Sequence, residues 1–244
     1  MNITHWKTIT RFVLALALAQ TCGAPAGADE LKPFEASYAW KWHGVTVAIS
    51  SLKLERQSGE LWAYSSKSEP RGLVSAFRSE RPTQLGIVRI ADELVQPLSY
   101  QAEDGTHATK RDADVKFDWV QSHASGVYED TPIDMQLKPG TQDDLSVQLA
   151  MFVQLLKGKT PANILLISKN NSVREYRYSR ESDATIDTPI GPVATVIYRS
   201  ERDGSRRVTR YWCAPSKGYL PMRVEQKKNN SVEWTMDIQS LRRE

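Results

Sequence analysis

The chain has 244 residues, of which 32 are basic and 29 acidic, and its formal net charge is +3. Two of the basic residues, Lys7 and Arg11, lie in an N-terminal leader, so the rest of the chain is close to neutral. This balance argues against nucleic acid or an anionic membrane surface as a partner. One of the two cysteines, Cys22, also lies in the leader, which excludes a disulfide framework.

The first 28 residues have the three parts of a secretory signal peptide. Basic residues precede an apolar run over 12–19, and Ala26-Gly27-Ala28 supplies small residues at the cleavage position. The apolar run is too short to cross a membrane as a helix, and the rest of the chain has no longer one. We therefore predict cleavage before Asp29, export to the periplasm, and one mature domain over 29–244.

Each cysteine raises a question of its own. Lipid attachment at Cys22 would make the protein a lipoprotein, but Gln20 stands where such processing sites carry a small residue, so a soluble product is favoured. Cys213 is flanked by apolar residues in the stretch Tyr211-Trp212-Cys213-Ala214. This setting predicts a buried, unreactive thiol.

Most of the mature chain has the pattern of β-strands. From Phe34 to Trp42 every second residue is apolar, which is typical of a strand with one buried face. Similar patterns predict strands at 45–54, 61–67, 84–90, 98–102, 114–121, 125–128, 164–167, 173–178, 193–199, 207–213, 222–227 and 232–238. Strands this close together leave no room for helical crossovers and indicate an antiparallel arrangement.

One segment has helical spacing instead. Leu145, Leu149, Phe152 and Leu156 recur at intervals of four, three and four residues, and Gly158 follows as a stop. We predict an amphipathic helix here. The fold class is therefore mainly β, an antiparallel β-barrel or curved half-barrel with this helix packed on or in it.

The residues before this helix read as a cap. Thr141 is predicted to cap it, with Asp144 as the return half of a capping box and Asp143 near the positive end of the helix dipole. Paired aspartates also suit a metal or acid–base site, but acids in a first helical turn are ordinary, so the capping interpretation is preferred.

Three segments resemble the DUF3108 family of exported bacterial proteins. They are GTQDDLSVQL over 140–149, TPIGPV over 188–193 and YWCAPSKGYLPMRVEQ over 211–226. The resemblance spans nearly all of the mature chain and implies a periplasmic, mostly β protein of unknown function, with no catalytic residues to carry over. The expected curved sheet with a helix inside is also similar to the half-barrels that carry lipoproteins through the periplasm.

No catalytic, metal or cofactor site is predicted. The mature histidines, His43, His107 and His123, have no spacing that would place two nitrogens on one metal. Glycine-rich phosphate loops and a Gly-x-Ser-x-Gly elbow are absent from the sequence. His123 and Ser125 would share one strand face, which leaves a hydrolase as a third hypothesis, but no orienting group is evident.

Aromatic residues are the better candidates for binding. The mature chain has six tryptophans, all on predicted strands: Trp40, Trp42, Trp62, Trp119, Trp212 and Trp234. We take all of them except Trp62, together with Phe152 of the helix, as candidate ligand-binding residues. The competing interpretation is that they fill the core between sheet and helix, the helix being either a fixed plug or a movable lid.

A second candidate surface lies between Pro70 and Pro82. Leu73 and Phe77 are predicted to contact an acyl chain or an envelope partner, while Arg71, Arg78 and Arg81 would meet an acidic headgroup. The simpler interpretation is a short helix that covers one end of the barrel, and it is preferred.

Two functions follow from these features. The first is a non-enzymatic periplasmic protein that binds a hydrophobic or amphipathic component of the cell envelope, such as a lipid. The second is a structural or accessory envelope protein that binds other proteins through its sheet edges and holds no small ligand. A lined cavity of several hundred cubic ångströms would favour the first.

Overall fold

The computed structural model describes residues 30–77, 79–161 and 163–243. The predicted signal peptide, its cleavage site, Cys22 and Arg78 lie outside these ranges. Among the described residues, no helix has the length and apolarity needed to cross a bilayer.

The described residues form one sheet of fifteen strands and one α-helix. The first eight strands are β1 (Phe34–Trp42), β2 (Val45–Ser58), β3 (Leu61–Pro70), β4 (Thr83–Ala91), β5 (Leu94–Glu103), β6 (Ala113–Asp118), β7 (His123–Tyr128) and β8 (Thr131–Gln136). The others are β9 (Thr141–Gln142), β10 (Ile164–Ser168), β11 (Ser172–Thr188), β12 (Gly191–Glu201), β13 (Arg207–Ala214), β14 (Leu220–Lys228) and β15 (Ser231–Arg243). The helix α1 (Ser146–Leu156) and three short 3-10 helices, η1 (Gly72–Ala76), η2 (Thr109–Arg111) and η3 (Pro215–Lys217), complete the fold.

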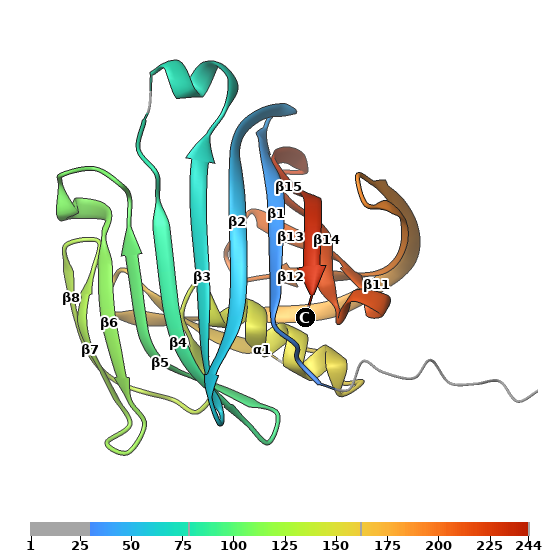
Figure 1. The fold of residues 1–244 in the computed structure, drawn as a ribbon. Helices are drawn as coiled ribbons and strands as arrows, with labels where there is room; N and C mark the ends of the chain where they lie inside the picture. Colours follow the sequence, from blue (N-terminus) through green and yellow to red (C-terminus); the bar gives the residue numbers. More distant parts are fainter. Residues whose placement is uncertain (1–29, 78, 162, 244) are drawn as a thin grey trace, which may run out of the picture.

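The sheet has the order β8-β7-β6-β5-β4-β3-β2-β1-β15-β14-β13-β12-β11-β10-β9. Neighbours are antiparallel throughout, except that β9 pairs with β10 in parallel. The sheet curves strongly, with α1 near one end and the β3–β4 hairpin, which carries η1, projecting at the other (Figure 1). The predicted mainly β fold with one helix is therefore confirmed.

Two strands were not predicted, and one predicted strand is shorter. The segments 131–136 and 141–142 form β8 and β9. The segment predicted as a strand over 114–121 ends at Asp118, because the Asp118 carboxylate accepts hydrogen bonds from the N–H groups of Val120 and Gln121, both at 2.9 Å. Such an Asx turn competes with the strand ladder, so Trp119 lies in a turn rather than on a strand.

The helix is buried on most of its surface, beyond the predicted apolar stripe. All four residues of its predicted apolar stripe are buried, but so are Met151, Val153 and Leu155 on other sides of the helix. A helix that is apolar almost all round belongs inside a core. The strands curve around α1 and cover it (Figure 1).

The predicted cap is also wrong in its residue. Thr141 belongs to β9, and its hydroxyl donates to the Lys138 carbonyl at 2.8 Å. Asp143 does the capping, because its Oδ1 accepts hydrogen bonds from the N–H groups of Leu145 at 2.8 Å and Ser146 at 2.9 Å. The Ser146 hydroxyl in turn accepts the Asp143 N–H at 2.9 Å. Asp143 therefore satisfies two backbone donors at the start of α1.

The two ends of the sheet meet through a side chain. Asn171, in the turn between β10 and β11, accepts the Asp134 N–H of β8 at 3.1 Å and donates to the Asp134 carbonyl at 3.3 Å. Lys169 of the same turn forms an ion pair with Glu129 at 2.7 Å. We call this contact the β8 seam. The Asn171 side chain bonds the N–H and the carbonyl of Asp134 much as a neighbouring strand would. It thereby occupies part of the outer edge of β8.

Cys213 is fully buried in the described structure, as predicted, and burial raises the pKa of its thiol. In protein that begins at Asp29, where Cys213 is the single cysteine, we expect a thiol reagent to modify the protein only after unfolding. The measurement is the mass increase with time, with and without denaturant. Complete modification of native protein at the rate of the denatured sample would contradict this burial.

Candidate ligand-binding groove

Three adjoining pockets line the concave face of the sheet. The inner pocket beside α1 has a volume of about 240 Å³, the middle pocket about 600 Å³ and the outer pocket about 700 Å³. The inner and middle pockets share Trp40, Asp144, Gln148, Trp234 and Met236. The middle and outer pockets share Ser68, Pro82, Asp104 and Arg111. Together they form what we call the groove, which extends from α1 to the β3–β4 hairpin.

Strand register explains why the middle of the sheet is hollow. One row across the concave face, Leu54, Tyr64, Gly86, Tyr100 and Val115, is fully buried beside α1. The next row, two residues further along each strand, consists of Leu52, Ser66, Gln84 and Ala102. Ser50 and Ser68 pair beyond it. Ser50, Ser66, Ser68 and Ala102 have small side chains, so these rows fill less space than the row with Tyr64 and Tyr100 and leave room for the middle pocket.

The inner pocket is mostly apolar. Helix α1 contributes Val147, Met151 and Phe152, and the facing strands contribute Leu166, Tyr176, Tyr178, Tyr211 and Val224. Tyr178 and Tyr211 lie side by side, with ring centroids 6.2 Å apart. Phe152 is only 1% exposed, so it lies in the core as well as at the pocket wall.

Trp40 and Trp234 stand between the inner and middle pockets. The two indole rings have centroids 4.9 Å apart and planes inclined by 40°. The Trp234 Nε1 donates to Gln226 Oε1 at 3.1 Å, whereas the buried Trp40 Nε1 has no hydrogen-bond partner among the described residues. A buried indole N–H normally donates a hydrogen bond, so the unpaired N–H of Trp40 is unusual.

Three other tryptophans predicted to bind ligand do not line the groove. Trp42 is 48% exposed at the end of β1, edge-on to His43. Trp119 donates to the Pro97 carbonyl at 2.6 Å and lies parallel to Phe117. Trp212 follows Tyr211 on β13 and therefore points to the opposite face from that pocket residue. The remaining one, Trp62, is 4% exposed and belongs to the core.

The segment with Leu73 and Phe77 forms η1, which agrees with the short helix predicted there. Both side chains are exposed, at 84% and 87%. Phe77 lines the outer pocket together with Val74, but Leu73 does not. Arg71 forms an ion pair with Glu69 at 3.3 Å, so its guanidinium already has an acidic partner.

Asp144, which the sequence predicts to be a capping residue, lies beside the groove. Asp144 lines both the inner and middle pockets and accepts a hydrogen bond from the Tyr128 hydroxyl. Burial raises the pKa of its carboxyl, although the Tyr128 hydrogen bond partly opposes this. On the next turn, Gln148 accepts the Tyr64 hydroxyl at 3.0 Å. In the sequence, Tyr64, Ser66 and Ser68 alternate along one strand. This alternation could have indicated that polar side chains lie on the inward face of that strand.

The hydrolase hypothesis gains an orienting group but no site. His123 Nε2 lies 2.6 Å from Asp134 Oδ1, and Ser125 pairs with Asp134 in the strand register. The Asp134 side chain is 82% exposed, and none of the three residues lines the groove. Within the described ranges, no group of three or more histidine, cysteine, aspartate or glutamate residues is placed to hold a metal ion.

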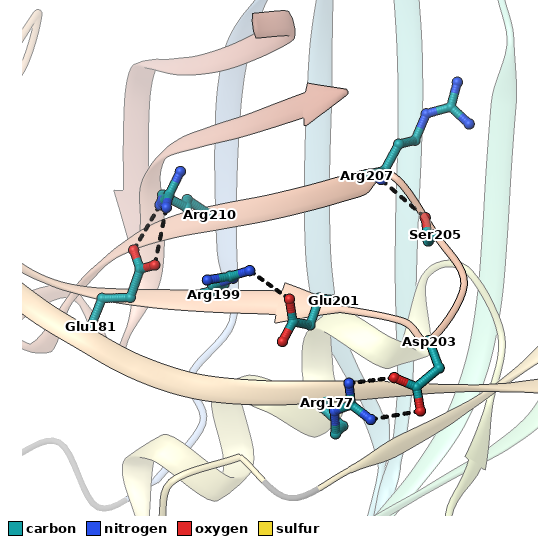
Figure 2. Close-up of polar contacts among 8 residues, drawn as sticks. All are labelled: Arg177, Glu181, Arg199, Glu201, Asp203, Ser205, Arg207 and Arg210. Carbon is teal, nitrogen blue, oxygen red and sulfur yellow. Dashed lines mark hydrogen bonds and ion pairs between the residues drawn. The ribbon is translucent and has the colours of Figure 1, made fainter. Parts of the chain in front are cut away.

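Basic residues on β11, β12 and β13 are paired with acids. Figure 2 shows Arg177 with Asp203, Arg199 with Glu201, and Arg210 with Glu181, at 2.5–3.1 Å. Arg207 bonds the Ser205 hydroxyl through its backbone N–H at 3.1 Å and forms an ion pair with Glu233 at 2.8 Å. These basic residues are therefore neutralised locally rather than gathered into a polyanion-binding patch.

Comparison with solved structures gives a likeness of fold. A beta-barrel-like protein of the domain of unknown function DUF1849 from Brucella abortus superposes with a TM-score of 0.59 at 9% identity, over 88% of this chain and 99% of that chain. A protein with a YmcC-like fold from Bacteroides fragilis gives a TM-score of 0.38 at 12% identity, over 87% of this chain and 97% of that chain. No curated protein matches the sequence.

The family comparison covers nearly the whole described sheet. Residues 34–237, from the start of β1 into β15, match the sequence profile described as protein of unknown function DUF3108. The matched range contains every strand that lines the groove, together with the Gln142-Asp143-Asp144-Leu145-Ser146 segment at the start of α1. The chain belongs to the DUF3108 family.

Proposed function

We propose that this protein is a non-enzymatic periplasmic protein that binds a hydrophobic or amphipathic component of the cell envelope in the groove. The observation that carries the proposal is the pairing of an apolar inner pocket with a larger, more polar middle pocket across Trp40 and Trp234. The middle pocket, at about 600 Å³, lies within the range of about 300–1,000 Å³ usual for small-molecule sites. An amphiphile likewise has an apolar part, which would suit the inner pocket, and a polar part, which would suit the middle pocket.

Different observations support the periplasmic location and the non-enzymatic role. The predicted signal peptide supports export to the periplasm. The non-enzymatic role is supported by the position of the best catalytic candidate, since the His123–Asp134 pair lies outside the groove on an exposed part of the sheet. A bound molecule in the groove would not reach it.

The accessory role through sheet edges has less support. Among the described residues, β11 pairs with β10 only over 172–176, which leaves the β11 edge from Arg177 to Thr188 without a strand partner. That edge carries Arg177, Arg180, Glu181 and Asp183, all in ion pairs. Charged side chains on an edge strand discourage the addition of another strand. We therefore favour the groove as the functional site.

Native mass spectrometry of protein purified gently from the periplasm, followed by extraction and lipid analysis, tests the proposal. We expect a stoichiometric amphipathic passenger in the wild-type protein. The Trp40→Leu/Trp234→Leu double variant should retain much less of it, whereas Trp212→Leu, on the opposite face of β13, should retain it fully. Thermal unfolding of all three proteins checks that the variants are folded.

Either of two results would refute the groove as the ligand-binding site. One is a wild-type protein that stays free of ligand after incubation with an envelope lipid extract, which would favour the accessory role. The other is equal loss of the passenger in Trp212→Leu and in the groove variant.

A further inference from the structure

The middle pocket is lined by hydroxyl and amide groups. Its sheet wall carries Ser50, Ser66, Ser68, Thr83 and Gln84, and α1 adds Gln148. The Ser50 and Ser68 hydroxyls are 2.5 Å apart, and the Gln84 Nε2 donates to the Tyr100 hydroxyl at 3.1 Å. Hydroxyl and amide groups both donate and accept hydrogen bonds, so this wall is complementary to a ligand that does the same.

The charges of the middle pocket disfavour an anion. Its lining includes the carboxyl groups of Glu103, Asp104 and Asp144 against one guanidinium, that of Arg111. The Asp104 carboxylate accepts hydrogen bonds from Thr106, and these hold its pKa below the usual value. A phosphate or carboxylate headgroup would therefore meet like charge where Glu103 and Asp104 lie.

The side of the middle pocket next to α1 does not favour a cation either. Asp144 lines both the inner and the middle pocket, as Trp40 and Trp234 do. The Tyr128 hydroxyl already donates to its carboxylate, and burial disfavours its charged form. Asp104 and Arg111 also line the outer pocket, where Lys110 contributes a further positive charge.

Trp40 supplies a donor that lacks an acceptor. Its Nε1 is buried and has no partner among the described residues, although the indole lines both the middle and inner pockets. Leaving a buried donor unsatisfied is unfavourable, so a small shift of the indole that let a ligand oxygen accept this N–H would stabilise the complex. An uncharged hydroxyl oxygen fits the donor and the neighbouring serines without introducing a charge.

We infer that the groove selects an amphiphile with an uncharged, hydroxyl-rich headgroup, such as a sugar, held in the middle pocket with its apolar chain in the inner pocket. The inference rests on the proposed function and specifies its ligand class. Ser66 is the best residue to substitute in a test, because it lines the middle pocket and lies between Leu52 and Gln84 in the strand register. Its neighbour Ser65 points to the opposite face of β3 and provides a matched control.

The test uses three probes with one common tail: octyl glucoside, octyl phosphate and octyltrimethylammonium, each below its micelle concentration. Binding is measured by calorimetry on protein stripped of passenger. We expect the glucoside to bind at least about tenfold more tightly than either charged probe. Ser66→Ala should reduce this preference several-fold, and Ser65→Ala should leave it unchanged.

The outcomes separate the two proposals. Equal binding of all three probes, or tighter binding of a charged probe, would overturn the headgroup inference and leave the groove intact as an apolar site. Failure of every probe and of an envelope lipid extract to bind would overturn the proposed function itself. Loss of glucoside preference in both serine variants would also refute the inference, because Ser65 does not line the groove.

Discussion

Phe152→Ala is expected to lower the free energy of unfolding by about 3–5 kcal/mol. Phe152 is 1% exposed and lies on α1, which is buried on most of its surface inside the curved sheet. Truncation removes apolar contacts and leaves a cavity that the surrounding strands fill only in part. The measurement is equilibrium denaturation in urea. Val120→Ala, in a turn where the valine is 97% exposed, is the control and should change stability by less than about 0.5 kcal/mol.

The same variant decides between a fixed plug and a movable lid. If α1 is a plug, its amides should exchange hydrogen only through global unfolding, and Phe152→Ala should accelerate that exchange in line with the loss of stability. If α1 opens as a lid, its amides would exchange at a much lower free energy than those of β1 or β15. A loss below about 1 kcal/mol in Phe152→Ala would also argue against a plug.

Asp143→Asn is expected to stabilise the protein at neutral pH. Burial raises the pKa of the Asp143 carboxyl to about 6, despite the hydrogen bonds that it accepts from Ser146 and Leu145. Since the native state then holds the proton more tightly than the unfolded state, this group reduces stability as the pH rises from about 4 to 6. The reduction is complete above that window and amounts to about 3 kcal/mol at most. Asparagine keeps an oxygen that can accept the two N–H groups, without the charge.

Urea denaturation of both proteins between pH 4 and pH 8 provides the measurement. The stability difference should be close to zero at pH 4 and should grow in favour of Asp143→Asn up to pH 7. Asp203→Asn is a control of opposite sign, because the ion pair with Arg177 lowers the pKa of Asp203 and its removal should not stabilise the protein. Asp143→Ala should be less stable than Asp143→Asn at every pH, since it lacks the cap. A pH-independent difference would contradict the expected titration.

Local patterns predicted most strands, and long-range contacts caused the errors. Alternation from Phe34 to Trp42 identifies β1 because one face of that strand is buried. In contrast, β9 has two residues and exists only by parallel pairing of Thr141 and Gln142 with Leu165 and Leu166. Nothing within its own segment indicates that pairing, so Thr141 looked like a helix cap.

The structure brings together only some of the residues that the sequence predicts to bind a ligand. Trp40, Trp234, Phe152 and Phe77 line the groove, and the two tryptophans were selected as aromatic residues on strands. Trp42, Trp119 and Trp212 carried the same signal but lie elsewhere. The hollow itself depends on which residues face each other across strands, such as the small pair Ser50 and Ser68. That register is a property of the assembled sheet rather than of one segment.

At the β8 seam the ends of the curled sheet are held together by side chains and not by a strand ladder. Elsewhere along the sheet, a change in circumference would break a ladder of backbone hydrogen bonds such as that between β11 and β12. At the seam, the Asn171 side chain offers two hydrogen bonds, each contributing about 0.5–1.5 kcal/mol. Motions that widen or narrow the curled sheet should therefore be largest at the seam. Leu166 and Tyr176, on the two strands joined by the Asn171 turn, line the inner pocket, so movement at the seam would change the width of that pocket.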